Sequence, residues 1–266
     1  MRDAFCGNMT YDGHTGTDIS IRSFKTMDSG VYIYAAADGK VVRWHDGEFD
    51  RSTEWKGGGL GNFIGLIHQD SLFTFYGHMV KHSLLVKMGD YVKAGQVLGK
   101  VGSSGNSKVP HLHFEVRDKY KRVIDPFSGD CQKVTPSLWI SQPPYDLRFY
   151  LIEQGFIPYR AGFDLLKERY GVRDTFYTDV DSVITFWLHI HGLQMGKIIR
   201  ADWYEPNGKL HCSYSLRWKR VWWRDFATPY IKMPDKIGKW TVKFYVDGDL
   251  ITSGNFCVMR RKQQTD

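Results

Sequence analysis

Hydrophobic residues in the first half of the chain fall in short runs that are rich in β-branched and aromatic side chains and are separated by glycines. Between Val31 and Glu115 these runs read VYIYAAADGKVVRW, NFIGLIHQ, SLFTFYGHM, YVKAGQVLGKVGSSG and HLHFEVRD. The dipeptides Asp38-Gly39 and Asp46-Gly47 are turn signals, and no window of a dozen residues keeps the helical period of about 3.6 residues. The pattern predicts a domain of mostly antiparallel β-strands.

The second half alternates between apolar and polar residues over longer segments. SVITFWLHIHG alternates, while KIIRADWYEPNGKLHCSYSLRW predicts a hairpin around Pro206-Asn207-Gly208 and GKWTVKFYVDGDLITSGNFCVM predicts another around Asp247-Gly248. One helix candidate stands near residues 160–170, with Phe163, Leu166 and Tyr170 on one face. Strands at this spacing predict a β-sandwich of the immunoglobulin-like kind. The fold class is therefore mainly β, with an antiparallel-sheet domain followed by a β-sandwich.

A boundary between two domains is indicated near residue 131. The segment that follows Asp125-Pro126-Phe127 contains Pro136, Pro143 and Pro144, which is typical of a linker. Residues 1–131 hold 16 basic and 15 acidic side chains, whereas residues 132–266 hold 20 and 14. We expect a first domain over residues 1–131, a boundary segment over 132–155 and an accessory domain over 156–266.

Length and composition exclude several classes of protein. The 266 residues, 42% of them hydrophobic, are enough for two ordinary cores and exclude disordered or collagen-like chains. No segment reaches the roughly 18 apolar residues of a membrane span, and the first residues lack the apolar region of a secretion signal. We therefore expect a mature form without a membrane span. The net charge of +7 favours polyanionic partners such as nucleic acid, wall polymers or membrane headgroups.

The four cysteines lie two in each half, and their spacing contains no C-x-x-C motif of a thiolate zinc site. Their even number allows three pairings if all are bridged. We favour a Cys6–Cys131 bridge, which would join the ends of the first domain and contribute about 4 to 5 kcal/mol in the chain-entropy model. Disulfides among Cys6, Cys131, Cys212 and Cys257 would place the protein outside the reducing cytosol. The alternative is four buried free thiols in a cytosolic protein.

Potential metal ligands and bases arrive in three segments of the first domain. His14 and Asp18 lie in GHTGTD, His78 follows Tyr76-Gly77, and His111 and His113 form an H-x-H pair in HLHFEV. On a strand, His111 and His113 project from the same face because side chains alternate with a period of two. Two imidazoles and a carboxylate around a tetrahedral ion leave one position open for water, which is typical of catalytic zinc.

Taken with the surrounding sequence, these motifs make the chain resemble the lysostaphin and LytM-like zinc peptidases of bacterial cell walls, the M23 metallopeptidases. The resemblance runs from about Gly13 to Phe127 and includes HTGTDIS, YAAADGKVV, GLGNFIGLIH, YGHM, VKMGDYVKAGQVLGKVGSSGNSKVPHLHFEV and DPF. It implies a LytM-like fold for the first domain, a Zn²⁺ cofactor and hydrolysis of the peptide crosslinks of peptidoglycan. Glycine-rich proteins are a second substrate class that the resemblance leaves open.

The resemblance also implies the role of each site residue. His14, Asp18 and His113 correspond to the zinc ligands, and His78 and His111 correspond to the catalytic pair that flanks the activated water. Which histidine acts as general base stays open. A family tyrosine upstream of the first ligand has no clear match, and Asn8 or Tyr11 stands in that neighbourhood.

Other polar residues have a simpler interpretation. His45, His68 and His82 lack a partner motif, and the second H-x-H, His189 and His191, lacks a third ligand at a recognisable spacing. A basic and aromatic cluster in the second domain either binds an anionic wall polymer or packs its tryptophans inward and exposes its cations. Its members are Arg217, Trp218, Lys219, Arg220, Trp222, Trp223 and Arg224.

We therefore expect a monomeric, extracytoplasmic zinc endopeptidase, secreted or periplasmic, that acts on peptidoglycan peptides or on glycine-rich polypeptides. The main alternative is a non-catalytic LytM-like protein that activates a wall amidase. Such relatives usually lack one or more metal ligands, whereas this sequence keeps all five site residues. A nucleic-acid-binding module would explain the positive charge but not the histidine motifs, so we expect no nucleic-acid partner.

Overall fold

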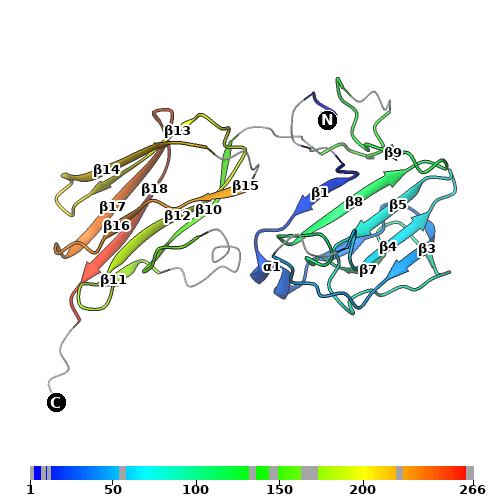
Figure 1. The fold of residues 1–266 in the computed structure, drawn as a ribbon, viewed down its shortest axis with the longest axis horizontal. Helices are drawn as coiled ribbons and strands as arrows, with labels where there is room; N and C mark the ends of the chain where they lie inside the picture. Colours follow the sequence, from blue (N-terminus) through cyan, green and yellow to red (C-terminus); the bar gives the residue numbers. More distant parts are fainter. Residues whose placement is uncertain are drawn as a thin grey trace, which may run out of the picture. The chain divides into compact units, whose positions relative to one another are not determined.

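A computed structural model describes residues 3–6, 10, 13–53, 58–131, 136–143, 149–162, 173–219 and 224–261. The chain divides into two compact units, residues 1–145 and 146–266. The regular secondary structure of both units is almost entirely β-strand (Figure 1), as the sequence predicts. Among the described residues, no helix is long and apolar enough to cross a membrane.

The first unit is organised around a seven-stranded antiparallel sheet with the order β1-β8-β5-β4-β3-β6, and β9 pairs with β8. A separate pair, β2 and β7, and one short helix, α1, complete its regular elements. The bounds are β1 Thr17–Ser20, α1 Phe24–Ser29, β2 Tyr32–Tyr34, β3 Gly39–His45, β4 Phe63–Ile67, β5 Phe73–Gly77, β6 Tyr91–Val92, β7 Val97–Lys100, β8 His111–Arg117 and β9 Val123–Ile124. The strands follow the glycine-separated runs because β-branched and aromatic side chains fit a pleated, half-buried surface.

Helix α1 has only six residues and is too short to give a periodic signal in the sequence. The Ser23 side chain accepts a hydrogen bond from the Thr26 backbone N–H at 3.2 Å, which caps its first turn. Gly30, with φ of 85°, ends the helix by donating its backbone N–H to the Met27 carbonyl. The buried side chains of Phe24 and Met27 anchor the helix to the unit.

The core of the first unit lies between the main sheet and the β2–β7 layer and includes Ile64, Leu66, Tyr76 and Phe114. Trp139 packs against Phe114, with ring centroids 5.7 Å apart. The first unit therefore extends past residue 131, where the sequence prediction ends it. A proline-rich segment resembles a linker in composition even when one of its aromatic side chains belongs to a core.

A Cys6–Cys131 disulfide joins the two ends of the first unit, as the sequence analysis favours. The Cys131 backbone N–H also donates to the Ala4 carbonyl at 2.9 Å. Cys212 and Cys257 are free thiols, so a bridge that includes them is wrong. They lie on β14 and β18, with β13 and β17 between those strands. Three strand spacings amount to about 14 Å, twice the reach of a disulfide.

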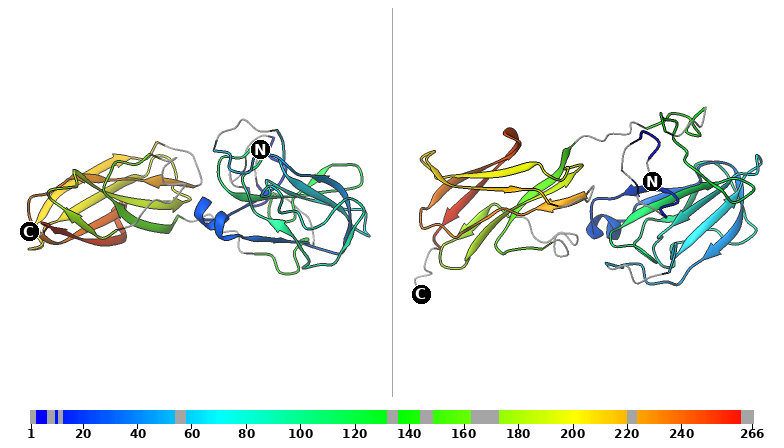
Figure 2. Two further views of the ribbon diagram at one scale, coloured as in Figure 1. Left: turned by 90° about the horizontal axis from the view of Figure 1, so that it is seen from below. Right: turned by 45° about the horizontal axis from the view of Figure 1, so that its top comes forward.

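The second unit contains a four-stranded and a five-stranded sheet (Figures 1 and 2). The first has the order β10-β12-β15 with β16 also paired to β12, and the second has the order β11-β18-β17-β13-β14. The bounds are β10 Tyr150–Ile157, β11 Thr175–Tyr177, β12 Val183–His191, β13 Ile198–Tyr204, β14 Leu210–Arg217, β15 Arg224–Ala227, β16 Tyr230–Lys232, β17 Gly238–Val246 and β18 Asp249–Met259. The predicted hairpins are confirmed as β13–β14 and β17–β18.

One hydrophobic core lies between these two sheets, which makes the second unit a β-sandwich. Phe186 of β12 belongs to the same cluster as Trp203 of β13 and Trp240 of β17, and all three are fully buried. Strand β10 begins at Tyr150, within the predicted boundary segment, because it pairs with β12 along most of its length. The immunoglobulin-like topology stays a prediction, and most of the predicted helix near residues 160–170 lies outside the described residues.

Removing the Cys6–Cys131 bridge is expected to destabilise the first unit. A Cys6→Ala variant frees a loop of 125 residues in the unfolded chain, and we expect the free energy of unfolding to fall by about 2 to 5 kcal/mol. Denaturant unfolding followed by fluorescence measures the change. Cys212→Ala is the matched control, because Cys212 is a free thiol. Equal stability of Cys6→Ala and the parent chain under oxidising conditions would contradict this account.

Candidate metal centre and histidine site

The predicted site residues come together on one face of the main sheet of the first unit. Strand β1 pairs antiparallel with β8, so that Asp18 lies opposite His113 and Ser20 lies opposite His111. On the other side of β8, Gly77 at the end of β5 lies opposite His113, and His78 follows immediately. Directly opposed residues project to the same face, so Asp18 and both histidines of β8 share one side of the sheet.

His14, Asp18 and His113 form a compact group, which we call the ligand cluster. One ligand atom from each lies within 4.8 Å of the others. The carboxylate oxygen Oδ1 of Asp18 lies 3.0 Å from His14 Nε2 and 3.0 Å from His113 Nδ1. The His14 and His113 side chains are 10% and 7% exposed and that of Asp18 is 34% exposed, so solvent reaches the cluster from the Asp18 side.

Gly16 allows the segment that carries His14 and Asp18 to lie against β8. A Cβ atom at this position would approach the Phe114 carbonyl oxygen to 2.6 Å and His113 Nε2 to 2.7 Å. Both distances are below any ordinary non-bonded contact of a Cβ atom. Only glycine therefore fits between the ligand cluster and the strand that holds its third member.

His78 and His111 form a second group beside the cluster, which we call the imidazole pair, with ring centroids 4.7 Å apart. His78 Nδ1–H donates to the Ser104 carbonyl at 2.7 Å, and His111 Nδ1–H donates to the Val109 carbonyl at 2.7 Å. These hydrogen bonds assign the neutral tautomer to both rings and leave Nε2 as an acceptor. His111 Nε2 lies 3.6 Å from Asp18 Oδ1, so the pair borders the ligand cluster.

Burial and charge set the protonation of these groups. Burial, reinforced by His111 and His113, lowers the pKa of His78 to about 3, and burial also lowers the pKa of His111. Burial opposes the charge of Asp18, but hydrogen bonds from His113 and His14 outweigh it and hold the pKa of this carboxyl well below its usual range. Asp18 is therefore an anion between two imidazoles, which is the electrostatic arrangement of a cation site.

Glu115 is a residue of the site that the sequence analysis missed. Its Oε2 lies 3.5 Å from His113 Nε2, on the side of the ring away from Asp18, and its carboxylate also contacts Arg117 and Thr15. Burial opposes the charge on His113, but Asp18 and Glu115 outweigh it and raise the pKa of His113 to about 9. A carboxylate behind a metal-ligating histidine orients the ring. The sequence does signal this neighbour, because Glu115 lies two residues after His113 on β8 and therefore projects from the same face.

The glycine and serine loop before β8 is a support for the imidazole pair. The side chains of Ser103, Ser104 and Ser107 are fully buried. The Ser104 hydroxyl donates to the Met79 carbonyl at 2.8 Å, while its own carbonyl holds His78. Asn62, also fully buried, donates to the Met79 carbonyl at 3.1 Å. These bonds hold the turn in which His78 has a φ of 59°.

The donor set of the ligand cluster fits zinc. Two imidazole nitrogens and one carboxylate oxygen are ligands that zinc accepts, and at metal–ligand distances near 2.0 to 2.1 Å the donors of a tetrahedral site lie about 3.3 Å apart. The observed separations of 3.0 Å to Asp18 Oδ1 lie close to this value. The three residues supply three of the four positions, which is the count of catalytic rather than structural zinc sites.

Other histidines have ordinary partners, as the sequence analysis expects. His68 contacts the Asp38 carbonyl and the Thr74 hydroxyl, both at 2.8 Å, and His45 contacts Glu48. His189 Nε2 accepts a hydrogen bond from Arg224 Nε at 2.6 Å, and His191 stacks on Tyr150. Within the described ranges, the ligand cluster is the one group of three or more ligands compatible with a metal ion.

Of the two alternatives for the basic and aromatic cluster of the second unit, the described residues favour inward-packed tryptophans with exposed cations. Trp218 is 5% exposed and belongs to the core of the sandwich, because the chain turns inward after the edge strand β14. Arg224 contacts His189, while Arg217 and Lys219 are exposed. Arg220, Trp222 and Trp223 lie outside the described residues.

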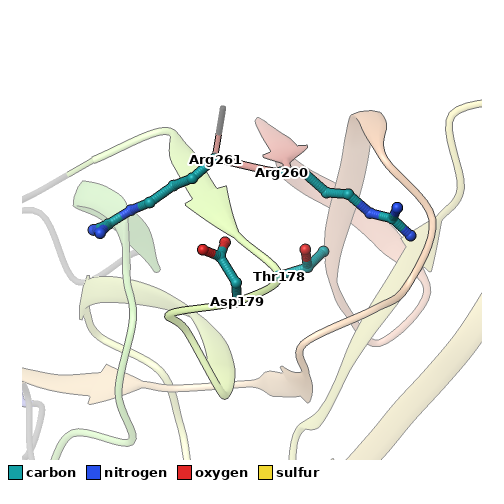
Figure 3. A pocket seen from close by; sticks show the side chains of 4 residues that line it. All are labelled: Thr178, Asp179, Arg260 and Arg261. Carbon is teal, nitrogen blue, oxygen red and sulfur yellow. The ribbon is translucent and has the colours of Figure 1, made fainter. Parts of the chain in front are cut away.

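A hollow in the second unit is lined by Thr178, Asp179, Arg260 and Arg261 (Figure 3). The two arginine side chains point away from each other, and Asp179 lies between them (Figure 3). These groups do not converge on one point, so the hollow offers no binding constellation comparable with the ligand cluster.

Comparison with known proteins gives matches to the first unit. The model of peptidase family M23 matches residues 12–126. Lysostaphin of Staphylococcus staphylolyticus is 40% identical over 104 residues, which are 39% of this chain and 18% of that protein. The glycyl-glycine endopeptidase ALE-1 of Staphylococcus capitis is 41% identical over 105 residues, 39% of this chain and 24% of that protein.

The peptidoglycan DD-endopeptidase ShyC of Vibrio cholerae is 33% identical over 102 residues, 38% of this chain and 19% of that protein. The chain thus matches less than a quarter of the length of each of these three relatives. The matched residues include the ligand cluster and the imidazole pair, since all five positions lie between 12 and 126.

A Gly16→Ala variant is expected to lose metal affinity without unfolding the unit. The added methyl group must push β1 away from β8 or displace the His113 ring, and either change separates the ligands. We expect zinc affinity, measured by competition with a chelator, to fall at least about tenfold. This corresponds to a loss of about 1.4 kcal/mol of binding free energy. Gly58→Ala is the control, because a Cβ atom there meets nothing within 4 Å. Unchanged zinc affinity in Gly16→Ala would refute the role given to this contact.

Proposed function

Because residues 12–126 are a domain of peptidase family M23, we propose that this chain is a zinc-dependent endopeptidase that hydrolyses peptide bonds in the crosslinks of peptidoglycan. The observation that supports this most directly is the placement of the imidazole pair beside the ligand cluster, with His111 Nε2 3.6 Å from Asp18 Oδ1. A structural metal site would not need two further buried imidazoles whose Nε2 atoms remain available as hydrogen-bond acceptors.

In this proposal His14, Asp18 and His113 hold the zinc ion. Bound there, zinc supplies the Lewis acidity that polarises a peptide carbonyl and makes water acidic near neutral pH. Glu115 fixes the His113 ring through the 3.5 Å contact to Nε2, which keeps Nδ1 directed at the cluster. Asp18 supplies the negative charge that the cation requires.

The imidazole pair transfers a proton from the attacking water to the leaving amine. With Nδ1–H of each ring donated to a backbone carbonyl, Nε2 of His78 or of His111 accepts a proton from the attacking water. The same nitrogen then returns the proton to the leaving amine. The other ring, whose Nε2 is also unprotonated, accepts a hydrogen bond from the attacking water and so helps to orient it. The rigid backbone acceptors keep both rings oriented through the reaction.

The disulfide supports an extracytoplasmic location for this activity. Cys6–Cys131 joins residues 125 positions apart, and bridges of this kind persist in oxidising compartments. We propose that the protein acts outside the cytoplasm, secreted or periplasmic, as a monomer with an accessory sandwich domain. A substrate of anionic wall material is consistent with the excess of basic residues in the second half of the chain.

Substitution of each histidine separates metal binding from proton transfer. His113→Ala is expected to lose zinc and hydrolysis together. His78→Ala and His111→Ala are expected to retain one zinc per chain while the rate of peptidoglycan cleavage falls about 10² to 10⁴-fold. Metal analysis of the purified chains and release of new amino termini measure the two effects. His45→Ala, which removes an exposed ring paired with Glu48, is the matched control.

Retained cleavage in His78→Ala and His111→Ala would contradict the proton-transfer role. Loss of zinc from either variant would mean that ligand and base have been exchanged. Normal zinc content with no cleavage by the parent chain would favour the non-catalytic activator of a wall amidase.

The type of bond that is cleaved can be identified by comparing substrates with different crosslinks. ALE-1 is named a glycyl-glycine endopeptidase and ShyC a peptidoglycan DD-endopeptidase, so both types of substrate should be tested in parallel. We expect cleavage of peptidoglycan with glycine bridges, of directly crosslinked peptidoglycan, or of both, with the fragments identified by mass spectrometry. Cleavage of neither wall type alongside hydrolysis of a glycine-rich protein would overturn the peptidoglycan assignment but leave the zinc peptidase intact.

A further inference from the structure

The outer face of the five-stranded sheet in the second unit carries an unusual set of side chains. Ala201, Trp203, Val242 and Phe244 point into the core, so their sequence neighbours on β13 and β17 point outward. The outward positions of β13, β17 and the paired edge strand β14 follow from the register. They are Ile198, Arg200, Asp202, Tyr204, Lys239, Thr241, Lys243, Tyr245, Ser213, Ser215 and Arg217.

Two tyrosines on this face lie together. Tyr204 and Tyr245 are partly exposed, and their side chains are hydrogen-bonded to each other. The Arg200 guanidinium lies 4.2 Å from the centroid of the Tyr245 ring, and Lys243 Nζ lies 5.1 Å from the centroid of the Tyr204 ring. The two rings and two cations therefore form one continuous patch, which we call the tyrosine platform.

The side chains that surround the tyrosine platform are short and hydrophilic. Ser213, Ser215 and Thr241 border it with hydroxyl side chains, and the Thr241 hydroxyl donates to Asn255 Oδ1 at 2.9 Å. Asp202 lies in the middle of the patch but is only 7% exposed, and its carboxylate is engaged by the Ser213 hydroxyl and by Arg200 Nε. The patch thus combines two partly exposed tyrosines with hydroxyl groups and cations.

The charge of this face is positive. At the outward positions of the three strands, Arg200, Arg217, Lys239 and Lys243 stand against the single carboxylate of Asp202. The chain as a whole is also basic, and its excess positive charge lies in the second half. Flat aromatic rings stack on the apolar faces of sugar rings, hydroxyl side chains bond to sugar hydroxyls, and guanidinium and ammonium groups pair with acid groups.

We infer that the tyrosine platform is a binding site for an acidic polysaccharide, whose sugar rings stack on Tyr204 and Tyr245 and whose carboxylates pair with Arg200 and Lys243. This site lies outside the residues proposed to hold zinc or move protons, so the inference goes beyond peptide hydrolysis and does not depend on it. It is distinct from the basic and aromatic cluster around Trp218, a side chain that is buried.

Binding of the full chain to polygalacturonate tests this inference, because that polymer carries carboxylates but no peptide bond. Affinity electrophoresis or calorimetry with the polymer gives Kd, and dextran serves as the neutral polysaccharide. We expect the Tyr204→Ala/Tyr245→Ala variant to raise Kd about tenfold or more and the Phe/Phe variant at the same positions to stay within about threefold of the parent. Arg200→Gln should raise Kd and make it less dependent on salt.

Tyr214→Ala is the matched control, since Tyr214 is a 50% exposed tyrosine of the same sheet at a position opposite the inward-facing Ala201. Its Kd should equal that of the parent. Equal Kd values for the parent and the double alanine variant would overturn the inference. Poly(glycerol phosphate) provides a polyanion without sugar rings, and equally tight binding of this polymer, unaffected by the tyrosine substitutions, would reduce the effect to general charge attraction.

Discussion

The geometry of the histidine site depends on how closely β1 can approach β8. The antiparallel register places Asp18 opposite His113, and this pairing brings a residue from near the start of the chain beside one that is 95 positions away. Gly16 makes the approach possible, since any side chain there would strike the Phe114 carbonyl or the His113 ring. His14 then reaches the same carboxylate from the irregular segment before β1.

Around this pairing, backbone and carboxylate groups fix the imidazole rings of the histidine site. The Ser104 and Val109 carbonyls select the tautomer of the imidazole pair, and Glu115 fixes the third ligand from behind. Buried polar groups are costly unless they are hydrogen-bonded, and here each such bond also orients a ring. The hydrogen bonds to the Ser104 and Val109 carbonyls therefore both orient the imidazole pair and stabilise the loop before β8.

Much of this arrangement follows from the sequence. Alternation and turn residues predict the strands, and the H-x-H spacing places His111 and His113 on one face. The resemblance to the M23 peptidases implies that His14, Asp18 and His78 join them. Every residue has a backbone carbonyl, so the sequence does not reveal that the Ser104 carbonyl orients a histidine. Glu115 looks in the sequence like any other polar residue on a strand. Strand order is also hidden, so the separation of Cys212 from Cys257 could not be foreseen. Trp218 and Trp139 show that a composition typical of a surface or a linker does not exclude burial in a core.

The two units thus present different chemistry, a candidate metal site with an imidazole pair in the first and a basic aromatic face in the second. Zinc K-edge X-ray absorption on the purified full chain examines the proposed metal ligands themselves. We expect one zinc per chain with nitrogen and oxygen ligands, two of them imidazoles, and loss of this signal in His113→Ala. A sulfur ligand, or a chain that retains no zinc after loading, would rule out this ligand set.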